Sequence, residues 1–265
     1  MIRSFRSELL KLSRPSIVVG GGAALAGFTA LATVLTFTTA TVTTRPAQNG
    51  RYPTATFAEL AAPDGLTRGF ANAAGLVGVL VFVLFLTSMT AEYGQGTIRV
   101  LLTRQPRRAR LLAGKFIALV AVIAAAMAAA ELLSAAVAVP VARARGIATT
   151  EWFSGGGFGH AAADYANALL AVALFGTVGF ALGVLLRSTP LALGVGLAWL
   201  LPLENIVQNS WAGAVHWLPG LLFGAVARGG TTGVSYPAAV GLALGYGALA
   251  FVVAALTFLR RDVST

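Results

Sequence analysis

The chain alternates between long apolar runs and shorter polar segments, and the apolar runs have the length that a membrane-spanning helix requires. A helix needs about 20 mostly apolar residues to cross a hydrocarbon core roughly 30 Å thick. Six runs meet this requirement, at residues 16–40, 69–89, 111–141, 165–186, 190–207 and 237–259. The pattern therefore predicts an all-α integral membrane protein with six transmembrane helices, formed by a single domain over residues 1–265.

Prolines and glycines mark the connections between these runs. Residues 41–68 are expected to form an external connector. Pro140 and residues 143–146 are expected to end the third run, and Gly155–Gly157 to lie in the turn-rich loop that follows it. Residues 187–190 are expected to form a tight turn on the opposite side.

Two further segments complete the predicted architecture. In residues 1–15, apolar positions recur at helical spacing with basic residues between them, which is typical of a helix lying along the membrane interface. Residues 208–236 are too short and broken for two spans, yet too apolar for an ordinary loop. We expect them to form short re-entrant or interfacial helices on the outer side, between the fifth and sixth spans. Positions at the membrane–water interface are expected for Trp152, Trp211, Trp217 and Tyr236.

The composition excludes a soluble domain. Hydrophobic residues make up 57% of the chain, charged residues 11%, and the mean hydropathy is +0.80, whereas soluble domains carry about 25% charged residues. The net charge of +10 is attributed to cytoplasmic loops and anionic lipid head groups rather than to nucleic acid. Because the chain has no cysteine and two distant histidines, neither a disulfide nor a metal site is expected.

Charge also predicts the orientation, because membrane proteins concentrate Arg and Lys in cytoplasmic loops. With six spans, both termini lie on one side, together with residues 92–115 and 187–190. That side holds thirteen of the 19 basic residues. We therefore expect a multi-pass protein with both termini in the cytoplasm.

The basic segment at residues 92–110 cannot lie in hydrocarbon, where one Arg at the centre of a span costs about 2.5–3.5 kcal/mol. After a Gly-x-Gly break, Ile98, Leu101 and Leu102 recur at helical spacing, and Thr97 can cap the first turn. Two interpretations remain open at this point. The segment is either a charged loop that only fixes topology, or a short helix that docks onto a soluble partner.

The order of residues in this segment carries a family resemblance. An apolar run is followed by Glu92, by Gly96-Thr97-Ile98-Arg99, by two leucines, by Pro106-Arg107-Arg108, and by Gly114-Lys115 at the start of the next run. This order, together with six spans, resembles the cytoplasmic loop of bacterial ABC transporter permeases of the type-2 (exporter) family. The resemblance implies that the segment contains a coupling helix, which is seated in a cleft on a separate ATPase subunit. It implies ATPase-coupling roles for Glu92, Gly96, Thr97, Ile98, Arg99, Leu101, Leu102 and Arg104.

The same resemblance implies the partners. A six-span chain of this family is half of a substrate pathway, so a second permease chain, identical or sister, and two ATPase subunits are expected in the bacterial inner membrane. ATP and magnesium would be bound by the ATPase subunits, because Gly114-Lys115 is followed by Phe116 and lacks the rest of a phosphate-binding loop. The chain itself is expected to bind no cofactor and to be no enzyme.

Glu131 and Glu204 are the acidic residues predicted to lie inside spans, where a carboxylate is costly and often functional. One interpretation is that both line the substrate pathway and favour cationic or polar-headed amphiphiles. The other is that each is satisfied by a neighbouring helix or reaches the outer interface. An ion-driven secondary carrier that uses these two residues is the alternative function, and a membrane-embedded enzyme would need a cluster of acids and histidines that the spans lack.

Overall fold

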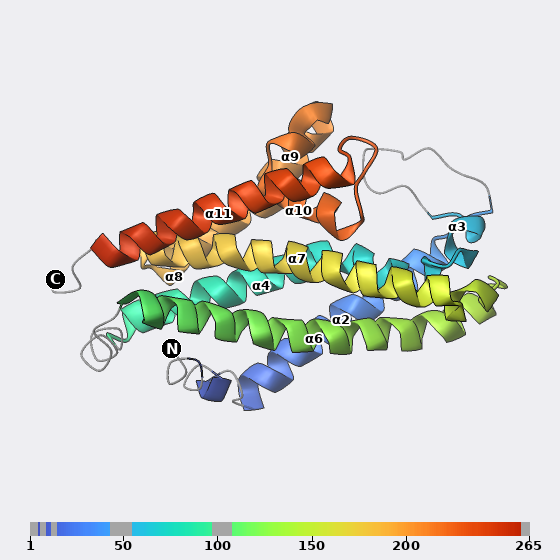
Figure 1. Ribbon diagram of the computed structural model, residues 1–265, viewed down its shortest axis with the longest axis horizontal. Coiled ribbons are helices and arrows are strands. Elements are labelled where there is room, and N and C mark those ends of the chain that lie inside the picture. The colour runs from blue at the N-terminus through green and yellow to red at the C-terminus, as the bar shows by residue number, and fades with distance from the viewer. Residues whose placement is uncertain (1–4, 6–8, 12–14, 43–54, 97–107, 261–265) are drawn as a thin grey trace.

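The computed structural model describes residues 5, 9–11, 15–42, 55–96 and 108–260, and these residues form a helical bundle without β-strands (Figure 1). Six helices are long and apolar enough to cross a membrane, as the hydrophobic pattern predicts. They are α2 (Pro15–Thr38), α4 (Arg68–Gly94), α6 (Arg108–Ala144), α7 (Gly155–Leu186), the continuous unit of α8 (Thr189–Ala198), η4 (Trp199–Leu203) and α9 (Glu204–Ser210), and α11 (Tyr236–Arg260).

Five shorter helical segments lie between the spans: α3 (Phe57–Ala61), η2 (Gly65–Thr67), η3 (Thr150–Phe153), η5 (Ala212–His216) and α10 (Pro219–Ala227). We call the end of the bundle where α4 and α7 end and α6 and α8 begin the base. The opposite end carries α3, η2 and η3 (Figure 1). Most of the predicted interfacial helix at residues 1–15, and residues 97–107 of the predicted coupling loop, lie outside the described residues.

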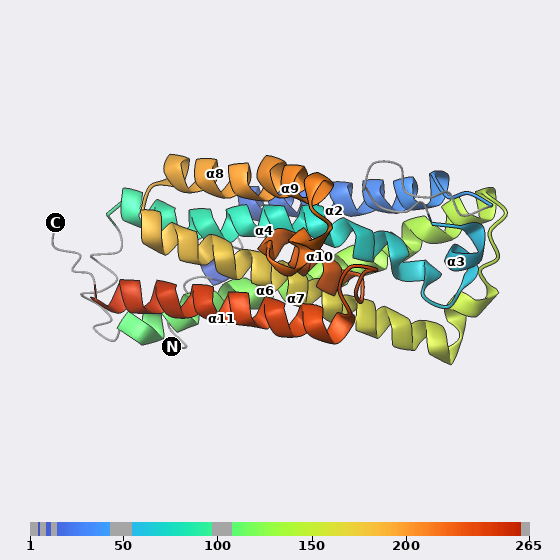
Figure 2. The ribbon, with the colours of Figure 1, turned by 90° about the horizontal axis from the view of Figure 1, so that it is seen from above.

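Helices α4 and α7 are antiparallel and form the centre of the bundle. They share its most extensive helix–helix interface among the described residues, and the other spanning helices pack around them. Helix α2 packs on α4 and α6, whereas α11 packs on α7 (Figures 1 and 2). Helix α10 lies between the α8–α9 unit and α11 (Figure 2) and packs on α7, α11 and α4.

Close approach of α4 and α7 depends on glycine. A Cβ at Gly179 would stand 2.3 Å from the backbone oxygen of Phe82, and one at Gly183 would stand 2.8 Å from the backbone oxygen of Leu86. Small residues let membrane helices pack backbone to backbone, where dispersion rather than the hydrophobic effect holds them together. These glycines therefore set the distance between the two central helices.

A second hydrophobic cluster closes the end opposite the base. The Trp152 side chain is fully buried there, its Nε1 donates to the Leu60 carbonyl oxygen at 2.9 Å, and its ring meets Phe37 edge-on at 5.7 Å. Trp152 is therefore a core residue, and the expectation that it anchors the chain at a membrane interface is wrong. Trp211, Trp217 and Tyr236 are exposed, as that expectation requires of them.

Helix α6 ends within residues 143–146, as predicted, but Pro140 does not end it. Helix α6 passes through Pro140 and ends at Ala144, where Gly146 (φ +71°) and Ile147 donate back to the carbonyl oxygens of Arg143 and Ala142. This is the glycine-terminated helix end in which two backbone N–H groups satisfy the last carbonyls. The proline near the end of the span does not stop the helix.

Helix α7 begins ten residues before the predicted start of the fourth span. The Ser154 hydroxyl accepts a hydrogen bond from the Gly157 N–H at 3.1 Å, so Gly155–Gly157 form the first helical turn rather than a loop. A serine at this position satisfies one of the N–H groups that a helix start leaves unpaired. The cap outweighs the low helix propensity of three glycines.

The glycine interface generates a stability prediction. In Gly179→Ala, the added methyl group meets the backbone of Phe82, which cannot rotate away, and overpacking of this kind costs about 1–3 kcal/mol. We expect a lower free energy of unfolding in detergent micelles. The matched control is Gly245→Ala on α11, where a Cβ meets nothing within 4 Å and stability is expected to stay equal or to rise. Equal behaviour of the two variants would refute the role assigned to Gly179.

Candidate functional site at the base of the bundle

The last turn of α4 holds a buried carboxylate between two lysines. Oε1 of Glu92 accepts a hydrogen bond from Nζ of Lys115 at 2.8 Å and from Nζ of Lys11 at 2.7 Å. Lys115 lies in the second turn of α6, and Lys11 lies in the N-terminal segment. One carboxylate oxygen therefore joins three segments that are far apart in the sequence.

The two ion pairs differ in burial. The side chains of Glu92 and Lys115 are 10% and 6% exposed, whereas Lys11 is 42% exposed. A buried charge that loses its partner keeps its desolvation penalty, which makes such a loss strongly destabilising, whereas an exposed pair contributes at most about 1 kcal/mol. Glu92 and Lys115 are thus the structural pair that closes the α4–α6 hairpin, and Lys11 is a weaker attachment to it.

The turn between α7 and α8 packs against the same turn of α4. Arg187 ends α7 in a left-handed conformation (φ 54°), and its guanidinium stands over the Tyr93 ring at 5.1 Å from the centroid. Two residues after Arg187, Oγ1 of Thr189 donates a hydrogen bond to Oγ1 of Thr90 at 2.7 Å. Both connections at the base therefore meet at Thr90–Tyr93. We use the name α4 junction for the residues that meet at the last turn of α4: Lys11, Thr90, Glu92, Tyr93, Lys115, Arg187 and Thr189.

Two of the eight residues with predicted coupling roles lie in the described part of the chain. Glu92 belongs to the α4 junction, and Gly96 (φ +65°) follows the end of α4 and donates to the Tyr93 carbonyl oxygen at 3.2 Å. The other six lie outside the described residues: Thr97, Ile98, Arg99, Leu101, Leu102 and Arg104. Lys11, Lys115, Arg187 and Thr189 are absent from the predicted set. The one usable signal is Lys115, a cation in the first turns of the third apolar run.

Glu204 has a different environment from the one expected of a pathway residue. It is 1% exposed, and both of its carboxylate oxygens are engaged. Oε1 accepts from the Trp199 indole Nε1 at 2.9 Å and from the Gly220 N–H at 3.0 Å, and Oε2 accepts from the Leu221 N–H at 2.9 Å. Glu204 therefore caps the N-terminus of α10, where the helix dipole favours a negative charge.

Glu131 is half-buried on α6, and its Oε1 is a buried atom without a hydrogen-bond partner among the described residues. The carboxylate of Asp164 on α7 acts on Glu131 electrostatically, and its Oδ2 accepts a hydrogen bond from Oγ1 of Thr67 at 2.6 Å. Among the described residues, Glu131 and Glu204 share no hydrogen-bond partner. In the described part of the chain, no group of three or more His, Cys, Asp or Glu residues is arranged to hold a metal ion.

Residues 49–264 match the DUF2705 family, which is described as a protein of unknown function. The chain belongs to the DUF2705 family. The match includes α4, α6 and every later helix, and therefore Glu92, Lys115, Glu131 and Glu204. Lys11 and α2 precede it. No curated protein matches the chain.

In this DUF2705 protein, the unequal burial of the two ion pairs predicts unequal effects of removing them. Lys115→Gln leaves the Glu92 carboxylate buried without its buried partner, and we expect the free energy of unfolding to fall by about 3–5 kcal/mol. Lys11→Gln removes an exposed partner and is expected to cost at most about 1 kcal/mol. Chemical denaturation in detergent micelles measures both.

Reversal of all three charges provides the control for this prediction. The triple variant Glu92→Lys, Lys11→Glu, Lys115→Glu keeps two opposite pairs and should recover much of the stability that Lys115→Gln loses. Equal losses in Lys115→Gln and Lys11→Gln would contradict the assignment of Lys115 as the structural partner.

Proposed function

We propose that this DUF2705 protein is the permease subunit of an ATP-driven exporter of the type-2 ABC class and that a separate ATPase subunit acts on its base. The observation that carries the proposal is the α4 junction. The loop that follows it is the segment whose residue order resembles a coupling helix, and both stems of that loop are fixed by the buried pair of Glu92 and Lys115.

A loop whose two stems are held together can transmit a force from a bound partner to both spans. Helix α4 ends at Gly94 and α6 begins at Arg108, so a partner that binds the intervening segment pushes on two spans at once. The Glu92–Lys115 pair keeps those spans from separating, because pulling two buried opposite charges apart is costly. Since α4 is also a central helix, a displacement of its last turn reaches α7 and α8 through packed contacts.

The proposed orientation puts the base in the cytoplasm of a bacterial cell and the chain in its inner membrane. The basic residues that gather at the base among the described residues, Arg108, Arg110, Lys115 and Arg260 among them, match the cytoplasmic excess of cations in membrane proteins. The end with α3 and Trp152 is then external.

The length of α6 supports the proposal that its far end projects beyond the outer surface of the membrane. Helix α6 has 37 residues, which is about 55 Å and exceeds a hydrocarbon core of roughly 30 Å. The Tyr236 hydroxyl at the start of α11 donates to Oδ1 of Asn167 at 2.7 Å, and an interfacial tyrosine there marks the outer boundary. Glu131, twenty residues beyond Leu111 and about 30 Å along α6, then lies near that boundary. We propose that it contacts the substrate as it leaves, rather than at the centre of the pathway.

The proposed assembly holds two permease chains, identical or sister, with two ATPase subunits. Large apolar side chains are exposed along α8, α9 and α11, and lipid or the second chain would cover them. The short buried helix α10 is our candidate for the re-entrant outer element predicted between the fifth and sixth spans.

The alternative function, an ion-driven carrier that uses Glu131 and Glu204, gains less support. Both oxygens of Glu204 are committed to Gly220, Leu221 and Trp199, so an ion would have to break three hydrogen bonds to bind there. Transport that follows a proton gradient in the absence of ATP would favour the carrier over the exporter.

The proposal is tested by purification from a cell that expresses the chain with the ATPase encoded beside it. We expect the ATPase to co-purify with the wild-type chain and to be lost when Arg99 and Arg104 are both changed to Glu, because two positive charges of the segment become negative. The matched control is Arg143→Glu, an exposed arginine at the opposite end of α6, which should retain the ATPase. Retention of the ATPase by the loop variant, or its absence from the wild type, would refute the proposal.

A further inference from the structure

The fifth span makes polar contacts at both of its ends, with the base at one end and with α10 at the other. At the base, Thr189 bonds Thr90 and the preceding Arg187 stands over Tyr93. Fifteen residues after Thr189, and about 22 Å further along the helix axis, Glu204 bonds the first N–H groups of α10. Figure 2 shows the α8–α9 unit running along one side of the bundle with α10 beside it.

The contact between Glu204 and α10 is specific in its geometry. Pro219 opens α10 and has no N–H, so Gly220 and Leu221 supply the first donors of the helix, and the carboxylate binds both. A Cβ at Gly220 would stand 2.5 Å from Oε2 of Glu204, so the approach requires glycine. The site is a bidentate cap made by a residue of another helix.

The joint inside the fifth span is fixed by the same carboxylate. Pro202 lies in η4, where the Glu204 N–H bonds the Trp199 carbonyl oxygen five residues earlier, a π-type turn. This turn brings the indole of Trp199 onto the same face as Glu204, and the indole donates to Oε1. Because the two sides of the turn are bonded to each other, a movement of α8 carries Glu204 with it.

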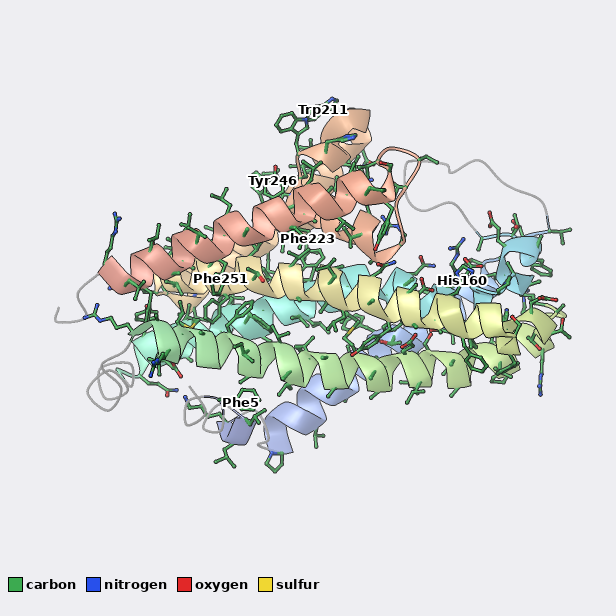
Figure 3. The ribbon with its side chains drawn as sticks, viewed as in Figure 1. Phe5, His160, Trp211, Phe223, Tyr246 and Phe251 are labelled. Carbon is green, nitrogen blue, oxygen red and sulfur yellow. The ribbon has the colours of Figure 1, made fainter. Side chains whose placement is uncertain are left out.

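Helix α10 is a short element whose body is held by apolar contacts. Leu222 to Ala227 are buried, and Phe223 points into the bundle, where its ring meets Phe175 of α7 at 5.1 Å (Figure 3). The helix is followed by Gly229 and Gly230, both with positive φ. At its N-terminus, by contrast, α10 is held by hydrogen bonds to Glu204 of the fifth span.

We propose that α8 and α9 transmit displacements of the α4 junction to α10 and that Glu204 is the positioning residue that makes this connection. The inference rests on the proposed function for the source of the displacement, an ATPase acting at the base. The connection itself is a property of this chain alone. Helix α10 then moves when the base moves, so a segment remote from the base responds to ATP.

A double-mutant cycle on the chain in lipid nanodiscs tests the connection without any ATPase. The readout is backbone hydrogen exchange of a peptide covering residues 219–227. Glu204→Gln removes one acceptor and sets an amide N–H₂ against backbone donors, so we expect exchange to accelerate by about tenfold, as for loss of a helix cap. Thr189→Val acts at the far end of α8 and should accelerate exchange of the same peptide by about threefold.

The decisive result is the double variant. If Thr189 acts on α10 through Glu204, Thr189→Val adds nothing once Glu204 is already Gln, so the two effects are not additive. Full additivity, or no effect of Thr189→Val on residues 219–227, would overturn the inference. The matched control is Thr87→Val on α4, whose hydroxyl bonds its own helix and which should leave the exchange of this peptide unchanged.

A second variant keeps the test decisive if Glu204→Gln does not fold. Gly220→Ala pushes the Glu204 carboxylate away from α10 and can replace Glu204→Gln in the cycle. Its effect on the exchange of residues 219–227 and the effect of Thr189→Val should again not add. Gly194→Ala, where a Cβ meets nothing within 4 Å, is its control on α8 and should not change the exchange of residues 219–227.

The complex with ATPase separates failure of this inference from failure of the proposed function. Trapping with ATP and vanadate should change the exchange of residues 219–227 in the wild type and not in Glu204→Gln, although Glu204→Gln still hydrolyses ATP. A wild-type chain that binds no ATPase but shows the non-additive cycle supports the connection and refutes the exporter. A chain that binds ATPase and shows additive effects refutes the connection alone.

Discussion

The structure depends on one buried carboxylate. Glu92 accepts two lysine ammonium groups on a single oxygen, and in a low-dielectric environment neither Glu92 nor Lys115 is stable without the other. This constraint explains why α4 and α6 end and begin side by side, and why the N-terminal segment meets them at Lys11. It also leaves the loop between α4 and α6 attached to two stems that cannot move independently.

Packing in the rest of the bundle extends the constraint on the last turn of α4 to α7 and to the fifth span. Glycines such as Gly179 and Gly183 bring α7 into backbone contact with α4, so the last turn of α4 is part of a packed central pair rather than a frayed end. The turn at Arg187 and Thr189 then joins the fifth span to the same turn. At the other end of that span, a second buried carboxylate, Glu204, is satisfied by α10. Buried charges thus mark both ends of one connected set of helices.

Hydrophobic length predicted the six spans because each exceeds what a soluble helix needs, and the structure confirms all six helices. Local chemistry was harder to interpret. Three consecutive glycines predict a loop at Gly155–Gly157 because glycine disfavours helices, but the Ser154 cap starts a helix there. The partners of Glu92 and Glu204 could not be predicted, since Lys11 is 81 residues from Glu92 and the α10 donors are backbone N–H groups that carry no sequence signal. Tryptophan in general favours membrane interfaces, and the core role of Trp152 could not be predicted because it depends on Leu60 and Phe37, which are remote in the sequence.

The most direct test of the account is the side of the membrane on which the base lies. The chain contains no cysteine, so a single cysteine at Arg110, an exposed residue near the start of α6, can be labelled with a membrane-impermeant thiol reagent. The account predicts labelling of Arg110→Cys in inside-out vesicles and not in intact cells, with the reverse for Arg143→Cys at the other end of the helix. Labelling of Arg110→Cys in intact cells would contradict a cytoplasmic base, and with it the exporter.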